Sequence, residues 1–372
     1  MENPKRFGIF GACLLILAIL LGSCGEESTG PTPSPISDYH LIYGPVSYPD
    51  TANGPIRNHY FTYSTETGEK IYISPSSELR YVDLIFNKAG TRAIFCGSVP
   101  PHGWRGTWII DYLTGDTLLK QEGIGGTFSL DKTEQYIVFH NHTGNKIATF
   151  PDLSVFYAGT GPFEVGGIFG SGKKAFYTRS YIDSLYIIDF SDQSAPVVIP
   201  YYLDYPGTRL TSVDYANDAE RDLFYLLLLD EISSQSRIMV IDCDSLRCIK
   251  QLGSNIPYMG MKLHPNGKQI YLRSQAGAGS SWNRIDIYSV AQNSTEAYFG
   301  IADYSGPVAF QPHKIEFTPD GQMMYFLIFG QILGDTPVVG VRLADKAVTQ
   351  YLVCDTGQVT FFRINPHNFA QK

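Results

Sequence analysis

The sequence has few charged residues and no run of basic ones. Asp, Glu, Lys and Arg make up 17% of the 372 residues, and the formal net charge is -8. A protein that binds nucleic acid through its phosphates needs a concentrated patch of positive charge. We therefore expect no nucleic-acid partner.

The sequence also lacks the short motifs that mark common enzymes. It contains no Gly-x-Ser-x-Gly nucleophile elbow and no glycine-rich phosphate loop. His140 and His142 share one face of an expected strand, but no cysteine or carboxylate cluster stands near them to complete a tetrahedral metal site. We expect no metal ion and no cofactor.

After residue 23, no apolar run is long enough to span a membrane. The run LFYLLLL at 223–229 has the length of a buried strand. The chain is instead rich in turn formers and aromatic residues, with 36 Gly, 22 Pro and 13% Phe, Trp and Tyr. This composition favours an all-β fold.

A two-part pattern repeats along the chain. Its first part is a strand, a polar turn and a second strand, as in YVDLIFNKAGTRAIF (81–95). Its second part is another pair of strands around a turn, as in WIIDYLTGDTLL (108–119). Four strands in each repeat of about 40 to 50 residues predict the blades of a β-propeller. The last apolar residue before the first turn marks six copies: Phe86, Leu130, Phe169, Tyr215, Leu263 and Phe317.

The two ends of the chain supply a seventh blade. YFTYSTETGEKIYIS (60–74) matches the second part of the pattern, and VTFFRINPHN (359–368) matches a first strand without partners. Joining one C-terminal strand to three N-terminal strands closes the ring and leaves no open sheet edge. We therefore predict an all-β, seven-bladed β-propeller over residues 39–372.

The chain resembles seven-bladed propellers of the YVTN and lactonase-like type. LHPNGKQIY (263–271) and FTPDGQMMYF (317–326) carry the Pro-Asn/Asp-Gly turn of that family. In the family, a histidine lies three residues before the phenylalanine of this turn, whereas here His313 lies four before Phe317 and Lys314 takes that place. Since successive strand residues face opposite sides, we expect the His313 ring to point away from the channel.

The N-terminus has the features of a secretion signal. Lys5 and Arg6 precede an apolar stretch over 7–21, and small residues stand just before Cys24. This resembles the lipobox of bacterial lipoproteins, in which the cysteine is lipidated and becomes the new N-terminus. We predict a signal peptide over 1–23, lipidation by palmitate-type chains at Cys24, and a flexible tether over 24–38.

The same resemblance implies a place in the cell envelope, held to the membrane by lipid. Gly25 stands where an Asp would retain a lipoprotein at the inner membrane, which implies the outer membrane, on its periplasmic or surface face. The alternatives are an ordinary secretory signal with an incidental cysteine, or an uncleaved N-terminal anchor.

Aromatic and arginine-bearing loops are expected on one face of the ring. In a four-stranded blade, the links between second and third strands share a face with the links between blades. Rigid aromatic and guanidinium groups dominate binding surfaces. We predict a surface there made of Trp104, Arg105, Tyr205, Tyr258, Trp282, Arg284 and Tyr304, with mere coverage of the blade ends by tyrosines as the alternative.

Two of the six cysteines flank a short turn. Cys243 and Cys248 enclose DSLR (244–247), so a four-residue loop would set them opposite each other, within reach of a disulfide. We predict this bridge, with two separately packed thiols as the alternative. Cys96 and Cys354 should stay free.

Two functions are compatible with these features. The first is a non-catalytic binding or scaffold role, in which the loop face meets an envelope protein, a peptide or a glycan. The second is a lactonase-like or sugar-lyase-like enzyme acting in the channel, which would need carboxylate, His or Arg residues on the inner strands of successive blades. Since the repeats show mostly Gly, Phe and Tyr there, we favour the binding role.

Overall fold

The computed structural model describes residues 38–47, 57–58, 61–72, 80–99, 104–141, 144–161, 165–170, 172–178, 184–202, 210–274, 283–304, 312–328, 338–351 and 358–369. They belong to a compact unit over Asp38–Lys372. The signal peptide, most of the tether and Cys24 lie outside the described residues. In the described ranges, no helix is long and apolar enough to cross a membrane.

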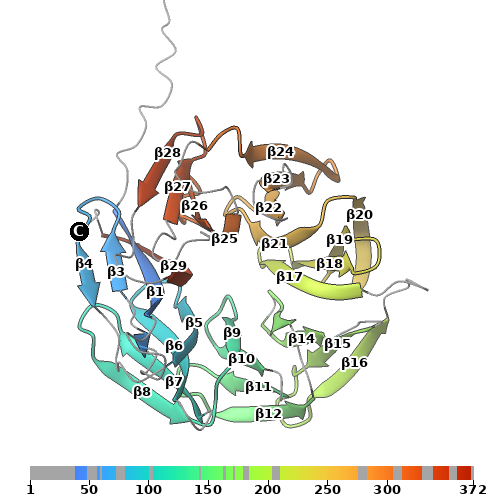
Figure 1. Ribbon diagram of the computed structural model, residues 1–372. Helices are drawn as coiled ribbons and strands as arrows, with labels where there is room; N and C mark the ends of the chain where they lie inside the picture. The colour runs from blue at the N-terminus through green and yellow to red at the C-terminus, as the bar shows by residue number, and fades with distance from the viewer. Residues whose placement is uncertain are drawn as a thin grey trace, which may run out of the picture. The chain divides into compact units, whose positions relative to one another are not determined.

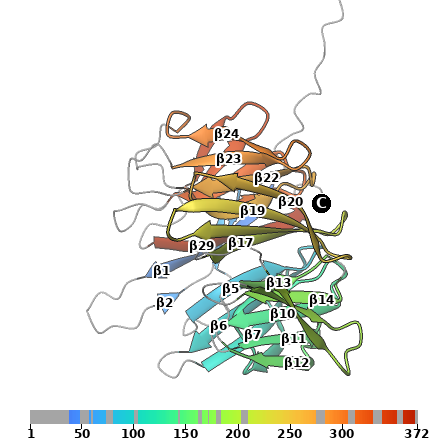
Figure 2. The same cartoon turned by 90° about the vertical axis from the view of Figure 1, so that its right-hand side faces the viewer.

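Seven antiparallel sheets stand side by side around a ring (Figure 1). Six of them are made of four consecutive strands, which we call blades 1 to 6. Seen from the side, β17, β19 and β29 run roughly along the axis of the ring (Figure 2). The strands of blades 1 to 3 are β5 (Arg80–Phe86), β6 (Arg92–Val99), β7 (Trp104–Asp111) and β8 (Thr117–Glu122); β9 (Thr127–Leu130), β10 (Tyr136–Asn141), β11 (Gly144–Thr149) and β12 (Val155–Thr160); and β13 (Val165–Ile168), β14 (Lys174–Thr178), β15 (Ser184–Asp189) and β16 (Val197–Tyr202). Those of blades 4 to 6 are β17 (Leu210–Asp218), β18 (Leu223–Asp230), β19 (Gln235–Asp242) and β20 (Arg247–Ser254); β21 (Tyr258–Leu263), β22 (Gln269–Ser274), β23 (Arg284–Ser289) and β24 (Ser294–Gly300); and β25 (Pro312–Phe317), β26 (Met323–Ile328), β27 (Val338–Arg342) and β28 (Val348–Tyr351).

Blade 7 joins the two ends of the described chain. The C-terminal β29 (Gln358–Asn368) pairs antiparallel with β1 (Tyr39–Ser47), and β1 continues to β3 (Phe61–Ser64) and β4 (Lys70–Tyr72). The short β2 (Arg57–Asn58) also pairs with β1. The predicted seven-bladed propeller and its closure by one C-terminal and three N-terminal strands are therefore confirmed.

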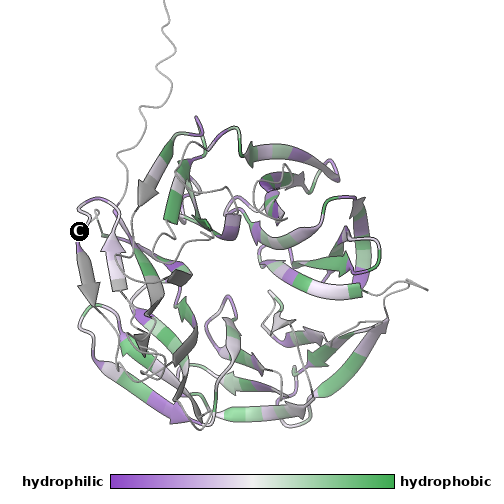
Figure 3. Cartoon of the chain, viewed as in Figure 1, coloured by the Kyte–Doolittle hydropathy of each residue, from purple (hydrophilic) through white to green (hydrophobic). Residues whose placement is uncertain are grey.

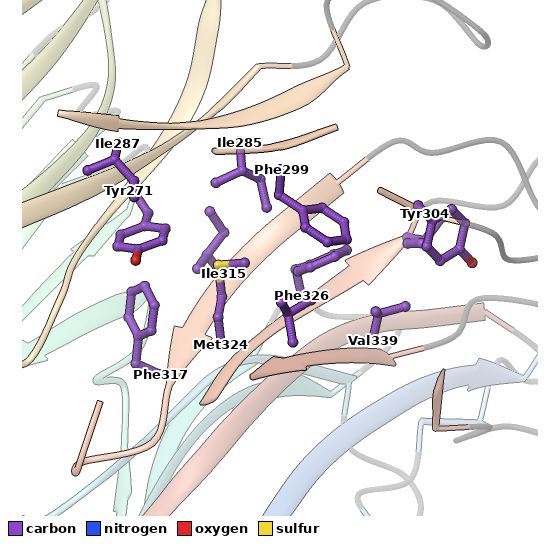
Figure 4. Close-up of a cluster of buried hydrophobic side chains, with 12 residues drawn as sticks. Tyr271, Ile285, Ile287, Phe299, Tyr304, Ile315, Phe317, Met324, Phe326 and Val339 are labelled. Atoms are coloured by element: carbon purple, nitrogen blue, oxygen red, sulfur yellow. The ribbon is translucent and has the colours of Figure 1, made fainter. Parts of the chain in front are cut away.

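The hydrophobic core is divided among the interfaces between blades. Seven clusters of buried side chains lie one at each junction of neighbouring blades, and two of them join blade 7 to blades 6 and 1. Figure 4 shows the cluster between blades 5 and 6, where Phe299 of β24 packs near Phe326 of β26. Each blade is thus held on both faces.

Burial on both faces explains the continuous apolar runs. In β18, Phe224 packs into the junction with blade 3, while the next residue, Tyr225, packs into the junction with blade 5. Since successive strand residues point to opposite faces, a strand between two blades needs apolar residues at every position. The run LFYLLLL meets that need.

Turn-opening aspartates have the local role that their position suggests. Asp111 accepts hydrogen bonds from the amides of Leu113 and Thr114, at 2.9 and 3.0 Å. Asp189 and Asp242 bind turn amides in the same way. These carboxylates shape hairpins, as expected of Asp at the start of a turn.

The predicted disulfide is absent. Cys243 and Cys248 are both free thiols, the first buried and the second exposed. Asp242 pairs with Arg247, so the four-residue loop covers 243–246, and Cys248 stands opposite Ile241. The loop lies one residue earlier than expected, which puts Cys243 in the turn and removes it from the ladder. Cys96 is free and buried, and Cys354 lies outside the described residues.

Bulges recur in the innermost strands and position the residues beside them. Each leaves one residue of the inner strand without a partner in the ladder. The unpaired residues are Val82 in β5, Val213 in β17, Met259 in β21, Lys314 in β25 and Thr360 in β29.

Candidate functional site

The inner strands surround a cavity of about 980 Å³ at the centre of the ring. Its wall is built by blades 1, 2, 4, 5, 6 and 7. In Figure 3, hydrophilic colour reaches the centre of the ring on β25. Ionisable side chains form much of this wall, and eight of them, which we call the channel cluster, are Asp83, Asp214, Lys262, Arg273, His313, Lys314, Glu316 and Arg363.

The channel cluster corrects the expectation that inner-strand positions are mostly Gly, Phe and Tyr. Six blades contribute to the cavity, and carboxylates, lysines and arginines come from five of them, on strands β5, β17, β21, β22, β25 and β29. The condition that we set for a site in the channel, charged groups on successive inner strands, is therefore met.

A chain of ion pairs crosses four blades, from blade 5 through blades 6 and 7 to blade 1. The guanidinium of Arg363 donates to Glu316 Oε1 at 2.6 Å and to Asp83 Oδ1 at 3.1 Å. Its Nε donates to the carbonyl oxygen of Leu84 at 3.0 Å. Lys262 donates from Nζ to the other Glu316 oxygen at 2.5 Å. Arg363 and Lys262 thus occupy both oxygens of one buried carboxylate.

The charges alternate because they share one position in neighbouring blades. Lys262, Glu316 and Arg363 each stand one residue before the apolar residue on which the repeats align: Leu263, Phe317 and Ile364. Aligning the repeats on those apolar residues would have shown plus, minus, plus in consecutive copies. That column is the signal that could have revealed the site.

Asp83 and Asp214 connect adjacent blades. The Asp83 carboxylate accepts hydrogen bonds from the backbone amide of Leu84 at 2.9 Å and from that of Phe128 in blade 2 at 3.4 Å. Asp214 binds the Tyr215 amide at 2.8 Å and the Met261 amide of blade 5 at 2.9 Å. Both carboxylates therefore have a structural role, and their charge is available to the channel in addition.

The bulge in β25 brings both His313 and Lys314 to the cavity. Both residues line it. The expectation that a one-residue shift turns His313 away is wrong, because the strand is not regular there: Lys314 has no ladder partner and has a φ of 43°. The extra residue breaks the alternation of sides on which that expectation depended.

Burial and neighbouring cations lower the pKa values of two side chains at this part of the wall. Burial, followed by the charges of Arg363 and Lys262, lowers the pKa of Lys314 to about 8, against the opposing pull of Asp83 and Glu316. Burial, Arg273 and Lys314 likewise lower the pKa of His313 to about 4.

The acidic members respond in opposite ways. Burial alone would raise the pKa of Glu316, but the charges of Lys262, Arg363 and Lys314 outweigh it and lower this pKa to about 2. Burial raises the pKa of Asp214, and its two amide hydrogen bonds oppose that rise. Glu316 is therefore fully ionised at neutral pH.

Arg273 reaches the channel across a glycine. A Cβ atom on Gly260 would lie 2.5 Å from Arg273 Nε, so the guanidinium needs the bare backbone at that point. Gly260 holds the inner-strand place that Asp214 holds in blade 4, directly after the bulge. Burial lowers the pKa of Arg273, and the charge of Asp214 opposes this.

The wall across blade 2 carries a neutral histidine. Burial lowers the pKa of His140 to about 4, with Asp83 opposing. Its Nε2 lies 2.5 Å from Thr127 Oγ1, and its Nδ1 has no hydrogen-bond partner in the structure. The second histidine of the HNH sequence, His142, lies outside the described residues. Within the described ranges, no group of three or more His, Cys, Asp and Glu could hold a metal ion.

The residues predicted for the loop face are not all at the surface. Tyr258 is fully buried and donates to Asp286 Oδ2 at 2.6 Å, and Arg284 binds the same carboxylate at 3.0 Å. Tyr304 is 8% exposed and lies at one end of the cluster between blades 5 and 6 (Figure 4). Two of the seven residues expected at the surface therefore belong to the core. Trp104 and Arg105 begin β7, but their side chains, together with Tyr205 and Trp282, lie outside the described part.

Comparisons with known proteins support the fold. No model of a protein family and no curated protein matches the chain. Among solved structures, a protein from Lactobacillus plantarum has a TM-score of 0.62 at 14% identity, covering 88% of this chain and 99% of its own. A protein from Bacteroides uniformis, provisionally named 6-phosphogluconolactonase, has a TM-score of 0.60 at 13% identity with coverages of 88% and 99%. A protein from Bacteroides fragilis with the same name has a TM-score of 0.58 at 14% identity, covering 89% of this chain and 99% of its own. The chain is thus a seven-bladed propeller that resembles lactonase-like structures, and the likeness shows the fold alone.

Proposed function

We propose that this protein binds a small anionic molecule, bearing a carboxylate or phosphate, in the central channel, while a lipid at Cys24 holds it in the cell envelope. The observation that carries the proposal is the convergence of four cations, Lys262, Arg273, Lys314 and Arg363, on one cavity wall. The binding role favoured by the sequence is kept, but the channel replaces the loop face as its site.

The carboxylates of the channel cluster have partners within the protein. Of the three carboxylates in the channel cluster, Glu316 and Asp83 are engaged by Arg363, and Asp214 accepts two backbone amides. Burial is the largest cause of the lowered pKa values of Lys314 and His313, and neighbouring cations add to it. A bound anion would lie against these cations.

The size of the cavity suits a metabolite-sized ligand. Its volume of about 980 Å³ lies at the upper end of the range for small-molecule sites. The name of the two Bacteroides proteins denotes a phosphorylated sugar lactone, an anion of the class that we propose. Arginine and lysine side chains recognise phosphate and carboxylate through charge-assisted hydrogen bonds.

Inorganic phosphate and citrate should raise the melting temperature of the detergent-solubilised full-length protein. A ligand at about 100 times its Kd stabilises the native state by about 3 kcal/mol. Differential scanning calorimetry should show this rise relative to sodium chloride of equal ionic strength, and glycerol should give none. Arg273→Met should bind the anions at least about tenfold more weakly, and so show a smaller rise in melting temperature, because it removes a desolvated cation.

The matched control is Lys120→Met, which removes an exposed cation of β8 with a side-chain exposure of 50%. It should bind the anions as the unmodified protein does. Equal stabilisation of the Arg273→Met and unmodified proteins would contradict the channel site, as would the absence of a rise with either anion.

Radiolabelled palmitate should enter the unmodified protein in growing bacteria, and Cys24→Ala should abolish the labelling. The reason is the Leu21-Gly22-Ser23-Cys24 string after a basic start, since lipidation requires the thiol. Cys248→Ala, which removes an exposed thiol far along the chain, is the control and should label normally. Labelling that survives Cys24→Ala would exclude the lipid anchor.

A further inference from the structure

Lys314 is unusual in its backbone. The non-glycine residues of the described chain with positive φ are Glu134, Leu153, Asp222, Ser234, Leu246, Asn293, Lys346 and Lys314, and all but Lys314 lie outside strands in the hairpin turns. Lys314 lies inside β25, where its φ is 43°. A non-glycine side chain in this region strains the backbone, and such outliers concentrate at functional sites.

The bulge gives this lysine its place in the channel. In β5, β17 and β21, the residue without a ladder partner is apolar: Val82, Val213 or Met259. In β25 it is a lysine that lines the cavity and is half-buried, so it is surrounded by protein charges yet open to a small molecule. The strained conformation thus directs an amine into the central space.

The surroundings of Lys314 favour its neutral form. The charged groups that face it are Arg363 of β29, Lys262 of β21, Asp83 of β5 and Glu316 of its own strand, and its neighbour His313 is neutral at pH 7. Arg363 and Lys262 are themselves committed to Glu316. Burial and cationic neighbours are the two means by which proteins turn a lysine into a nucleophile.

We propose that Lys314 forms an imine with the channel ligand, which would be a small anion that also carries an aldehyde or ketone group. This rests on the proposed channel site and names the class of ligand that it takes. The neutral amine adds to the carbonyl carbon, the C=O oxygen gains a proton and leaves as water, and a C=N bond remains. Hydrolysis reverses the step, and no oxidant or reductant takes part.

A cation beside Lys314 is the reason to expect an anionic carbonyl compound. Arg273 lines the same cavity and contributes to the lowered pKa of His313, the residue next to Lys314. A carboxylate or phosphate held by this cation would bring a nearby carbonyl carbon to the amine, and fixed proximity is worth several orders of magnitude in rate. An oxo acid such as glyoxylate is the smallest molecule with both groups.

The fraction of Lys314 in the neutral amine form determines the expected rate of labelling. With a pKa of about 8, about one Lys314 in ten is neutral at pH 7, against about one in 3,000 for a lysine with a pKa of 10.5. Labelling of Lys314 should therefore be at least about tenfold faster than labelling of exposed lysines, even after allowance for lower intrinsic nucleophilicity. Its rate should fall as the pH decreases below about 8.

The test is reductive trapping on the full-length protein. Glyoxylate and sodium cyanoborohydride should place a carboxymethyl group on Lys314, located by peptide mass mapping, faster than on Lys120. Acetaldehyde, which lacks the anion, should label Lys314 more slowly than glyoxylate does. Lys314→Met should lose the fast adduct, while Lys120→Met should keep it.

The outcomes separate this inference from the channel site. Citrate stabilisation without preferential labelling of Lys314 would overturn imine formation and leave anion binding intact. Equally fast labelling by acetaldehyde and glyoxylate would overturn the assignment of an anionic carbonyl compound. Lys314→Met should keep a cooperative melting transition, which shows that the variant is folded. A fast adduct that persists in this variant would refute the role of Lys314.

Discussion

A chain that ends at Gly357 should have no cooperative unfolding transition. The deletion removes β29, which supplies the inner strand of blade 7 along the length of β1. It also removes Phe362 and Ile364, both buried in the junction with blade 6. Each such side chain contributes about 1.5–3 kcal/mol, and a domain has only about 5–15 kcal/mol of net stability. Calorimetry and size-exclusion chromatography should show aggregation in place of a folded monomer.

The open edge makes the loss larger than the sum of side chains. Without β29, the backbone groups of Leu41 to Tyr43 that pair with it face the channel unpaired, and unpaired strand edges promote association between chains. The control is a deletion of 370–372, which lie beyond β29 and should leave the melting temperature unchanged. A protein truncated at Gly357 that melts as the unmodified one does would contradict closure by this strand.

The sequence was sufficient to predict the ring because its evidence is local and repeated. Each blade has its own turns and apolar strands, so every repeat restates the same pattern, and the missing parts at the two ends complement each other. Burial between blades then requires apolar residues on both strand faces, as in β18, where Phe224 and Tyr225 pack into different junctions. Errors in one repeat do not change the number of blades.

The channel cluster was missed because each member is a single residue in a different repeat. Arg363 and Asp83 are 280 positions apart, so no motif contains both. In blade 4 the repeats were also aligned on the wrong residue, Tyr215. The residue that corresponds to Phe86 of blade 1 is Asn217, because Asn217 pairs with Phe224 in the same place before the turn as Phe86 pairs with Ala93. That two-residue error concealed the place of Asp214 beside the bulge.

Bulges were the second obstacle. A bulge adds one residue to a strand and reverses the side to which later residues point, and no residue type marks it in a sequence. Alternation along β25 therefore gave the wrong side for His313. The same limit applies to the hairpin after β19, where a loop displaced by one residue separated Cys243 from Cys248.

Replacing Arg363 should destabilise the protein more than replacing any exposed arginine. Arg363→Met removes the partner of two carboxylates, Glu316 and Asp83, whose side chains are 8% and 9% exposed. Removing one partner of a buried ion pair leaves uncompensated charge and typically costs about 3–5 kcal/mol. Since the Arg363 side chain itself is 21% exposed, we expect the lower end, about 3 kcal/mol, in urea unfolding at pH 7.

The pH dependence of the stability loss shows whether ionised Glu316 is its source. The pKa of Glu316 in the folded protein is about 2, below that of an unfolded glutamate, so its interactions stabilise the fold above about pH 4.3 and this contribution is lost as the pH falls toward 2. Without Arg363 this pKa should be higher, so the difference between the two proteins should shrink over the same range. Urea unfolding at about pH 7 and pH 3 measures it.

Arg342→Met is the matched control, because Arg342 forms an exposed ion pair with Asp345 at 3.2 Å, with side-chain exposures of 40% and 52%. Exposed pairs contribute about 0–1 kcal/mol, so this variant should differ little from the unmodified protein at either pH. Arg363→Lys should lie between the two, since it keeps one charge but loses the second contact and the bond to the Leu84 carbonyl. Equal losses for Arg363→Met and Arg342→Met would mean that the ion pairs of Arg363 with blades 6 and 1 contribute nothing to closure. In that case β29 would hold the ring through its strand pairing and apolar side chains alone.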